Sequence, residues 1–459
     1  MKKGKFGGYG GQYVNEILMP ILIELEAAFE KHYPTAEFQE KLNILLRDYA
    51  GRPTPLYYAE NFSKLVGCKV YLKREDLVCG GSHKLNNALG QALLTKEMVK
   101  TRMITETAAG QHGLATAMAG NICGLETEVF MGVKDIKRQA SNVKRIKLLG
   151  AKVTPVDIGM GVLKDAVSDT LRKWTACSQT THYLMGSTVG PHPYPEIVAT
   201  FQSVIGKELK EQIIEKEGTL PDTVVACGSG GSNALGAFRS FINEKEVKLV
   251  FVEGGGESLE ADNSAAAFKI GKPGVLHGAV MQVLQDENGQ IKPSRTRAAG
   301  LNYPGRGPEI SSLVNSGRVK AGYAFDNEVF EAVKIMCRTE GLIPALETAH
   351  AIAYMMKNKE GFDKNEVVIL NYSGRGPEIS SLVNSGRVKA GYAFDNEVFE
   401  AVKIMCRTEG LIPALETAHA IAYMMKNKEE FDKNEVVILN YSGRGDKDLE
   451  TIMRYFHEA

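Results

Sequence analysis

The chain has 459 residues, long enough for two or three domains with separate cores. Its 55 basic and 55 acidic residues cancel, and the lack of a basic run argues against nucleic-acid binding. No apolar run approaches the roughly 20 residues of a membrane span, and the basic start leads into glycines rather than an apolar signal segment. Seven scattered cysteines indicate reduced thiols, so we expect a cytoplasmic globular protein.

Short apolar, β-rich runs alternate with helical runs along the chain. The expected strands are residues 69–73, 102–105, 127–131, 151–155, 223–227, 248–252 and 436–440. This alternation predicts an α/β fold with parallel sheets covered on both faces. We expect two doubly wound domains, residues 1–200 and 201–459, and expect the segment of about 50–80 to be able to pack with the second domain.

The first chemical signal is Lys84, which follows Ser82 and His83 and opens a helix-forming run. A cation is misplaced there, because the start of a helix already carries partial positive charge. A lysine tolerated at this position suggests an amine used as a neutral nucleophile or bound covalently. The same helix end suits a phosphate. The lysine and the phosphate site together favour pyridoxal phosphate held as a Schiff base. The alternative is a solvated surface lysine.

Two later strand-to-helix junctions carry further signals. Residues 106–113 form a loop of small residues suited to a substrate carboxylate, and Glu106 could transfer protons if burial raises its pKa. The alternative is an ordinary acidic helix cap. The glycine-rich loop 227–236 is typical of a phosphate cradle. A dinucleotide site ending at Glu253 is the competing interpretation, but it gives Lys84 no role.

Residues 305–376 recur as 374–445, offset by 69 positions and differing only at Gly361 and Glu430. Repeat folds have diverged units, so we interpret this as a tandem duplication of a 390-residue protein. Only one copy of the strand ending in Ser373 or Ser442 can occupy one position in a sheet. We expect the second copy to do so, because the tail 446–459 follows it directly and a longer loop costs little entropy.

Several longer motifs point to one family. They are residues 6–14, 50–56, 72–77, 190–195, 284–290, 343–351 and 443–448. On these residues the chain resembles the β subunits of tryptophan synthase. The resemblance implies the type II pyridoxal-phosphate fold and condensation of L-serine with indole. It also implies a β2 homodimer at the core of an allosteric α2β2 complex, with an α subunit supplying indole through a tunnel.

The resemblance also assigns roles to residues. Lys84 would hold the cofactor and carry the Cα proton, and Glu106 would help to expel the serine hydroxyl. The other cofactor residues would be His83, Asn86, Ser187, Gly230, Gly231, Ser232, Asn233, and Glu416 with Ser442 or their first-copy equivalents Glu347 and Ser373. Substrate would be bound by Thr107, Gly110, Gln111, His112 and Asn302. No metal site is assigned, although the family leaves room for a monovalent cation.

Three positions depart from the family pattern. Ala108 and Ser229 replace usual glycines, and Asn302 replaces a usual aspartate. The Asn302 change gives limited support to a serine or threonine deaminase as an alternative activity. A second alternative is an inactive protein that binds only the α subunit because the duplication disrupts its C-terminal half.

Overall fold

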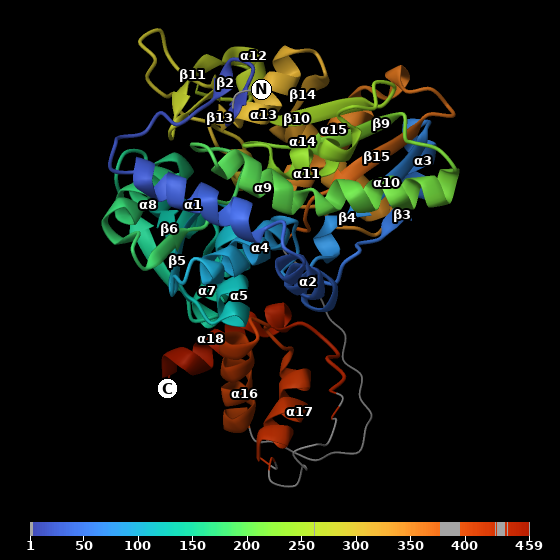
Figure 1. Cartoon of the computed structure of the whole chain (residues 1–459). Coiled ribbons are helices and arrows are strands. Elements are labelled where there is room, and N and C mark those ends of the chain that lie inside the picture. The colour runs from blue at the N-terminus through green and yellow to red at the C-terminus, as the bar shows by residue number, and fades with distance from the viewer. Residues whose placement is uncertain are drawn as a thin grey trace.

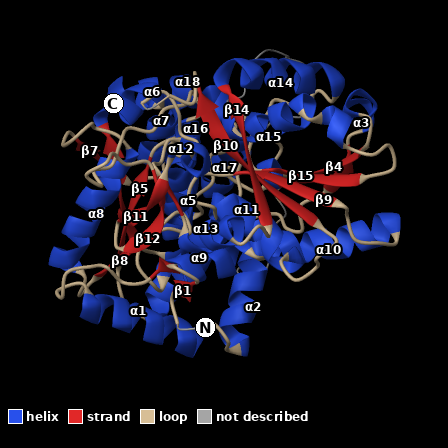
Figure 2. Cartoon of the chain, turned by 90° about the horizontal axis from the view of Figure 1, so that it is seen from above, coloured by secondary structure: helices blue, strands red, loops and turns tan. Residues whose placement is uncertain are grey.

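This computed structural model describes residues 3–260, 262–376, 395–426, 428, 437 and 439–458. Its strands pair into three sheets (Figures 1 and 2). The first sheet is parallel, in the order β7 (Lys152–Val156), β6 (Glu126–Gly132), β5 (Arg102–Thr107), β8 (Thr181–Tyr183). The second has the order β14 (Val319–Phe325), β10 (Lys248–Gly256), β9 (Thr223–Cys227), β15 (Val367–Tyr372), β4 (Lys69–Arg74), β3 (Leu56–Tyr58). Only β3 runs antiparallel in it. The predicted α/β fold with parallel sheets is therefore confirmed.

A third, small antiparallel sheet was not predicted. It joins β1 (Lys5–Phe6), β2 (Tyr9–Gly10), β11 (Lys272–Leu276), β12 (Ala279–Val283) and β13 (Gly305–Arg306). Its pairing brings Gly10 opposite Val280. Such short strands, paired across most of the chain, leave no periodic pattern in the local sequence.

Helices flank the two larger sheets (Figure 2). They are α1 (Met19–His32), α2 (Ala36–Ile44), α3 (Glu60–Val66), α4 (Lys84–Glu97), α5 (Gln111–Cys123), α6 (Val133–Arg138), α7 (Ala140–Leu148), α8 (Leu163–Cys177), α9 (Tyr194–Gln202), α10 (Val204–Glu217), α11 (Ser232–Phe238), α12 (Ala267–Ile270), α13 (Pro308–Asn315), α14 (Asp326–Thr339), α15 (Leu346–Lys357), α16 (Asp395–Thr408), α17 (Leu415–Lys426) and α18 (Leu449–Glu458). Short helical turns are η1 (Leu45–Tyr49), η2 (Glu75–Leu77), η3 (Arg239–Phe241), η4 (Ala299–Leu301), η5 (Lys359–Gly361) and η7 (Gly445–Asp448). Within the described residues, no helix combines the length and apolar character that a bilayer crossing requires.

The first copy of the duplicated segment fills the second sheet. Its strand β15 lies between β4 and β9, with Val368 opposite Val70 on one side and Thr223 on the other. In the second copy, the described residues 437 and 439–441 lie outside any strand. The expectation that the second copy completes this sheet is therefore wrong.

The tail explains why the first copy can occupy the sheet. The helices α16, α17 and α18 lie beyond α5 and α7, at the foot of the molecule (Figure 1). This position brings Asp446 within 3.2 Å of the Arg145 guanidinium on α7. The helices of the second copy bring the tail to α7, beside the first sheet. The tail can therefore pack there although the described residues of the second-copy counterpart of β15 do not enter the second sheet.

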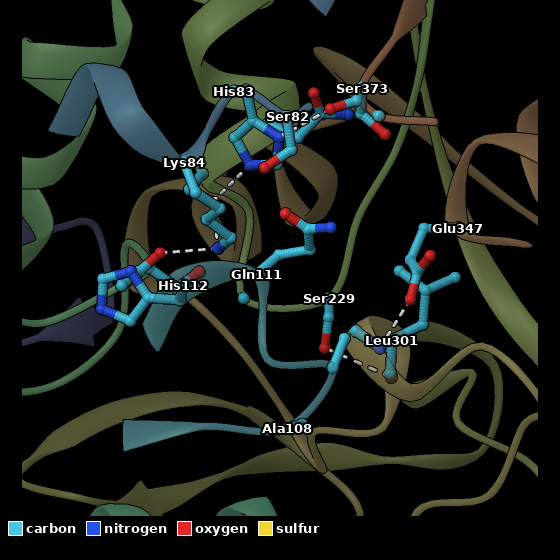
Figure 3. Close-up of a pocket in the computed structure, with 18 of the residues that line it drawn as sticks. Ser82, His83, Lys84, Ala108, Gln111, His112, Ser229, Leu301, Glu347 and Ser373 are labelled. Atoms are coloured by element: carbon cyan, nitrogen blue, oxygen red, sulfur yellow. Dashed lines mark hydrogen bonds between the residues drawn. The ribbon is translucent and has the colours of Figure 1, made fainter. Parts of the chain in front are cut away.

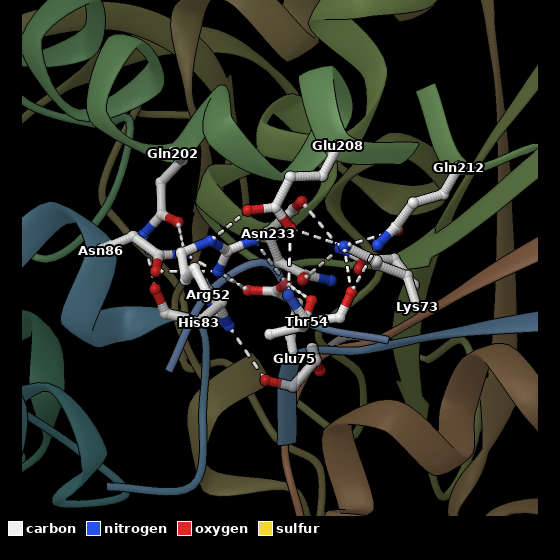
Figure 4. A network of polar contacts seen from close by, with 12 residues as sticks. Arg52, Thr54, Lys73, Glu75, His83, Asn86, Gln202, Glu208, Gln212 and Asn233 are labelled. Atoms are coloured by element: carbon white, nitrogen blue, oxygen red, sulfur yellow. Dashed lines mark hydrogen bonds and ion pairs between the residues drawn. The ribbon is translucent and has the colours of Figure 1, made fainter. Parts of the chain in front are cut away.

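A buried network of charges holds the start of α4 against α10 (Figure 4). The Arg52 guanidinium donates to both oxygens of Glu75, at 2.8 and 2.9 Å, and to both oxygens of Glu208 at the same distances. The Lys73 ammonium lies 2.6 Å from Glu208. Arg52, Lys73 and Glu75 are almost fully buried, so each charge depends on its partners.

We expect Glu75→Gln to lower the free energy of unfolding by about 3–5 kcal/mol at pH 7, because it leaves the buried Arg52 without half of its countercharge. Burial alone would raise the pKa of Glu75, but Arg52 and Lys73 lower it to about 2 from 4.5. The native carboxylate therefore adds stability above pH 4.5, and this stability is lost as the pH falls towards 2, by about 3 kcal/mol in total.

Urea unfolding of the wild type and of Glu75→Gln from pH 7 to pH 3 measures this difference. The free energy of unfolding of the variant should lack this part of the decrease at low pH. Glu60→Gln is the matched control, since Glu60 pairs with Lys64 at the exposed surface. Equal stability of Glu75→Gln and Glu60→Gln would contradict the role of the buried network.

Candidate active site

A pocket opens where the two parallel sheets approach one another with the carboxyl ends of their strands. Residues that follow β5, β9 and β15 form its walls, together with the start of α4 (Figure 3). Carboxyl ends of parallel strands are the usual place for ligands in open α/β sheets. The pocket therefore collects the chemistry of sequence segments that lie far apart in the chain.

Lys84 begins α4 and extends along the pocket wall. Its Nζ donates to the Gly186 carbonyl at 2.7 Å and to the Ser232 hydroxyl at 3.3 Å. Burial of the amine lowers its pKa to about 8, although Glu106 and Glu347 oppose this effect. Because its pKa is about 8, a substantial fraction of the amine is neutral near pH 8. Neither of its hydrogen bonds is to a carboxylate, which would favour the charged form.

His83, the residue before the helix, connects three parts of the pocket. Its Nδ1 lies 3.2 Å from the Ser373 carbonyl, and its Nε2 lies 3.4 Å from the Ser232 hydroxyl. Burial, with a smaller effect of Lys84, lowers the pKa of His83 to about 3, so the ring is neutral at physiological pH. His83 thus joins α4 to the glycine-rich loop and to the end of β15.

Glu106 lies near the end of β5 and is 6% exposed. Burial raises its pKa to about 7, and its Oε2 has no hydrogen-bond partner within the described chain. A carboxyl group with a pKa near neutrality is able to give or accept a proton at physiological pH. Its position in the pocket supports the proton-transfer role expected from the sequence over a simple helix cap.

The residues after Glu106 form a tight turn into α5. Gly110 adopts a left-handed φ of 85° at the start of the helix, and its N–H donates to the Thr107 hydroxyl at 3.1 Å. Gln111 and His112 lie on the pocket wall. His112 is held by Thr105, whose Oγ1 is 2.7 Å from its Nε2, while its Nδ1 remains without a partner in the described residues.

The glycine-rich loop crosses from β9 to α11 with its backbone turned to the pocket. The N–H groups of Gly230, Gly231 and Ser232 donate to no acceptor in the described chain. A side chain at Gly230 would lie 2.4 Å from the Ser187 hydroxyl, and Gly231 has a left-handed φ of 113°. Only glycines allow this approach, and converging N–H groups suit a phosphate. Asn233 instead braces the loop, donating to the Cys227 carbonyl at 2.8 Å.

The far end of the pocket belongs to the first repeat copy. The Ser373 hydroxyl faces it beside Thr348, whose Oγ1 lies 2.9 Å away. Glu347 also lines the pocket and accepts a hydrogen bond from the Gly300 N–H at 2.7 Å. The second-copy residues Ser442 and Glu416 are exposed and lie outside this pocket, and Glu416 pairs with Lys447.

Three other predicted residues lie outside the pocket lining, namely Asn86, Asn302 and Gly110 in the turn before α5. The Asn86 side chain belongs to the buried network, where it accepts from Arg52 at 3.0 Å. Asn302 lies in a neighbouring cleft, and its amide makes both of its hydrogen bonds to the backbone of Thr296. The geometry therefore gives no support to cofactor binding by the Asn86 side chain or substrate binding by the Asn302 side chain.

Gly186, Thr348 and Tyr303 were not expected at the site from the sequence. Gly186 acts through its backbone carbonyl, which no side chain signals, and Thr348 matters only because β15 brings Ser373 beside it. Tyr303 lines the pocket and donates or accepts a hydrogen bond with His277 at 2.8 Å. No local motif marks these positions. Of the departures, Ser229 has an evident role, since its hydroxyl donates to the Leu301 carbonyl at 3.3 Å.

These residues fit pyridoxal phosphate. The unpaired N–H groups of the glycine-rich loop match its phosphate, and the Lys84 amine matches its aldehyde carbon. Ser373 supplies a hydroxyl to the pocket lining, beside Ser82 and His83. Among the described residues, no group of three or more His, Cys, Asp and Glu side chains is placed to hold a metal ion.

Comparisons with known proteins agree with this chemistry. A family model described as pyridoxal-phosphate dependent enzyme matches residues 48–374, ending within the first copy. Tryptophan synthase beta chain 1 of Methanosarcina acetivorans is 56% identical over 378 residues, covering 82% of this chain and 94% of that protein.

Solved structures share the fold at low identity. A threonine deaminase from T.th. is 21% identical with a TM-score of 0.55, covering 78% of this chain and 99% of that one. A maize serine racemase is 18% identical, also with a TM-score of 0.55, covering 75% and 96%. These two likenesses establish a common fold only.

We expect Gly230→Ala to weaken pyridoxal phosphate binding about tenfold or more, because its Cβ would lie 2.4 Å from the Ser187 hydroxyl and 2.7 Å from Val189. Titration of the apoprotein with the cofactor, followed by absorbance, measures the change. Gly361→Ala is the control, since a Cβ there meets no atom within 4 Å. Unchanged affinity of Gly230→Ala would show that the loop does not hold the phosphate.

Proposed function

The chain belongs to the tryptophan synthase β chains, within the pyridoxal-phosphate dependent enzymes, and we propose that it condenses L-serine with indole to give L-tryptophan and water. The observation that carries the proposal is one pocket containing the enclosed Lys84 amine, the glycine-rich loop and the Glu106 carboxyl group. This combination suits replacement of a hydroxyl at the β carbon of an amino acid.

Pyridoxal phosphate, when bound, supplies an electron sink that stabilises negative charge at the amino-acid Cα. Gly230, Gly231 and Ser232 would hold its phosphate. Lys84 would bind the cofactor and carry the Cα proton on Nζ, a task that its lowered pKa supports. Thr107, Gly110, Gln111 and His112 would hold the serine carboxylate.

Glu106 would move the other protons. At a pKa of about 7 its Oε2 can protonate the serine hydroxyl, which then leaves as water, and can afterwards accept a proton from indole. Ser373 would face the pyridine nitrogen as a neutral partner. A hydroxyl leaves that nitrogen less protonated than a carboxylate would, which favours elimination and β-addition over racemisation.

The proposed partner is a tryptophan synthase α subunit, bound to a β2 core in an α2β2 complex. The identity of 56% to a β chain across most of its length supports this assembly. We also propose a cytoplasmic location, because all seven cysteines are free thiols, as expected in a reducing compartment.

The alternative activities have weaker support. Likeness to a deaminase rests on the fold alone, and Asn302, the residue that favoured it, lies outside the pocket lining. An inactive protein would need an incomplete site, but the first copy contributes Glu347 and Ser373 to the pocket.

Tryptophan synthesis by the purified chain with serine, indole and pyridoxal phosphate tests the proposal. We expect Lys84→Ala to lose turnover to trace levels while remaining folded, because both the covalent anchor and the proton carrier are removed. Chromatography of the products separates tryptophan from the pyruvate that a deaminase would form. Formation of pyruvate without tryptophan when indole is present would reject the proposed reaction.

We expect Glu106→Gln to keep the cofactor absorbance and to lose most tryptophan formation, because an amide cannot transfer the proton. Since burial raises the pKa of Glu106 to about 7, its acid form predominates below pH 7 and is lost above it. The wild-type kcat/KM for serine, which reports groups of the free enzyme, should therefore decline as the pH rises through about 7, and the residual activity of the variant should lack this decline. Loss of cofactor binding would instead indicate a structural role.

We expect Ser373→Asp to alter the absorbance spectrum of the bound cofactor, because it places a carboxylate at the end of the pocket. Ser442→Asp is a control of identical sequence context, and its exposed position should leave the spectrum unchanged. A spectrum that responds only to Ser442→Asp would mean that the second copy completes the site in solution.

A further inference from the structure

Arg306 is a fully buried cation that lies outside the pocket lining. Its Nε donates to an oxygen of Glu253, which is also fully buried, at 2.6 Å. Its Nη1 donates to the Tyr303 carbonyl at 2.8 Å and to the Gly305 carbonyl at 3.0 Å, and its Nη2 donates to the Ala265 carbonyl. One guanidinium thus gathers three backbone carbonyls and one carboxylate in the interior of the protein.

Glu253 is the countercharge of this cation. From the sequence, it was the candidate acid of a competing dinucleotide site, but in the structure it ends no such site. The Phe268 N–H donates to both of its oxygens, at 3.2 Å each, and the remaining bond is the one from Arg306. Desolvation offsets most of the attraction within a buried ion pair, so the pair adds little net stability by itself. Its clearest effect is on the carbonyls that it orients.

Those carbonyls belong to the segment 303–307, which forms part of the active-site wall. Tyr303 lines the pocket. The Gly307 N–H donates to the Gly230 carbonyl at 3.0 Å, and a Cβ at Gly307 would lie only 2.5 Å from that oxygen. Gly230 belongs to the loop that suits the cofactor phosphate. The peptides on either side of Arg306 therefore contact the pocket and its phosphate loop.

We propose that Arg306 is a positioning residue that acts as a tethered cation for this wall, and that it takes the place of the monovalent cation for which the family leaves room. Backbone carbonyls that converge away from water are ligands for an alkali-metal ion. Here the guanidinium already occupies them, so the residues present do not fit a further ion. A guanidinium cannot dissociate from the chain and stays charged, so cofactor binding should need no added cation.

Titration of the wild-type apoprotein with pyridoxal phosphate, followed by absorbance, tests this first. We expect the same affinity, within about twofold, in the chlorides of sodium, potassium, caesium and tetramethylammonium at equal ionic strength. Because cofactor binding is measured, the result does not depend on which reaction the enzyme performs. An affinity at least about tenfold higher in any alkali chloride than in tetramethylammonium chloride would overturn the proposal.

Arg306→Ala tests the same idea by removing the tethered cation. In tetramethylammonium chloride the variant should bind the cofactor at least about tenfold more weakly, because the carbonyls of Tyr303 and Gly305 lose their shared donor. The space left behind keeps these carbonyls and the Glu253 carboxylate, which suit potassium or caesium. Either ion should therefore restore most of the affinity and raise the melting temperature of the variant more than that of the wild type. A loss of affinity that no alkali ion restores would overturn the proposal.

Arg318→Ala is the matched control, because the Arg318 guanidinium also binds backbone carbonyls but lies outside the pocket lining. The carbonyls belong to Phe241, Ile242, Glu244 and Val247. The cofactor affinity of this variant should equal that of the wild type in every salt. A cation dependence like that expected for Arg306→Ala would show a general effect of losing a buried arginine, and would overturn the proposal.

If Arg306→Ala does not fold in any salt, Glu253→Gln with Arg306→Met removes both charges together, a change that buried ion pairs often tolerate. The double variant should fold, yet it should bind the cofactor at least about tenfold more weakly than the wild type in tetramethylammonium chloride. Wild-type affinity in the double variant would show that the pocket wall needs no cation, and would overturn the proposal.

Discussion

The second sheet has a single position between β4 and β9, and the active site depends on which strand fills it. Parallel pairing on both sides fixes the register of β15, and with it the direction in which Ser373 leaves the sheet. From there the Ser373 carbonyl accepts a hydrogen bond from the His83 backbone N–H at 3.2 Å. The strand that fills this position therefore also helps to place the residue beside Lys84.

The pocket shifts the pKa values of two ionisable groups towards neutral pH from opposite directions. Burial lowers the pKa of Lys84 to about 8 and raises that of Glu106 to about 7. The same low polarity keeps His83 and His112 neutral. One physical effect, the exclusion of water by packed walls, thus prepares both an amine that can accept protons and a carboxyl group that can donate them.

Much of the site was predictable because its signals are local. Lys84 and the loop around Gly230 stand where a helix begins after a strand, and Glu106 lies near the end of a strand that leads into a helix. That pattern is visible in the sequence. The two copies of the repeat show which part of the structure is not determined by local sequence. Helices α14 and α16 span equivalent residues, as do α15 and α17, whereas the strand Val367–Tyr372 has no counterpart among the described residues of the second copy. A helix satisfies its own backbone, but a strand needs neighbours that only the fold provides. The roles expected for the Asn86 and Asn302 side chains remain predictions, and both side chains lie outside the pocket lining because side-chain direction depends on distant partners.

The order of the two copies has a consequence for how the protein reaches its native state. During synthesis at about 5–20 residues per second, the first copy leaves the ribosome several seconds before the second is complete. The sheet can then close before any competitor exists. In refolding from denaturant both copies are present at once, and two strands of the same sequence compete for one position. During synthesis one strand can pair with β4 and β9 without a competitor, whereas during refolding from urea two strands of the same sequence compete to pair with them.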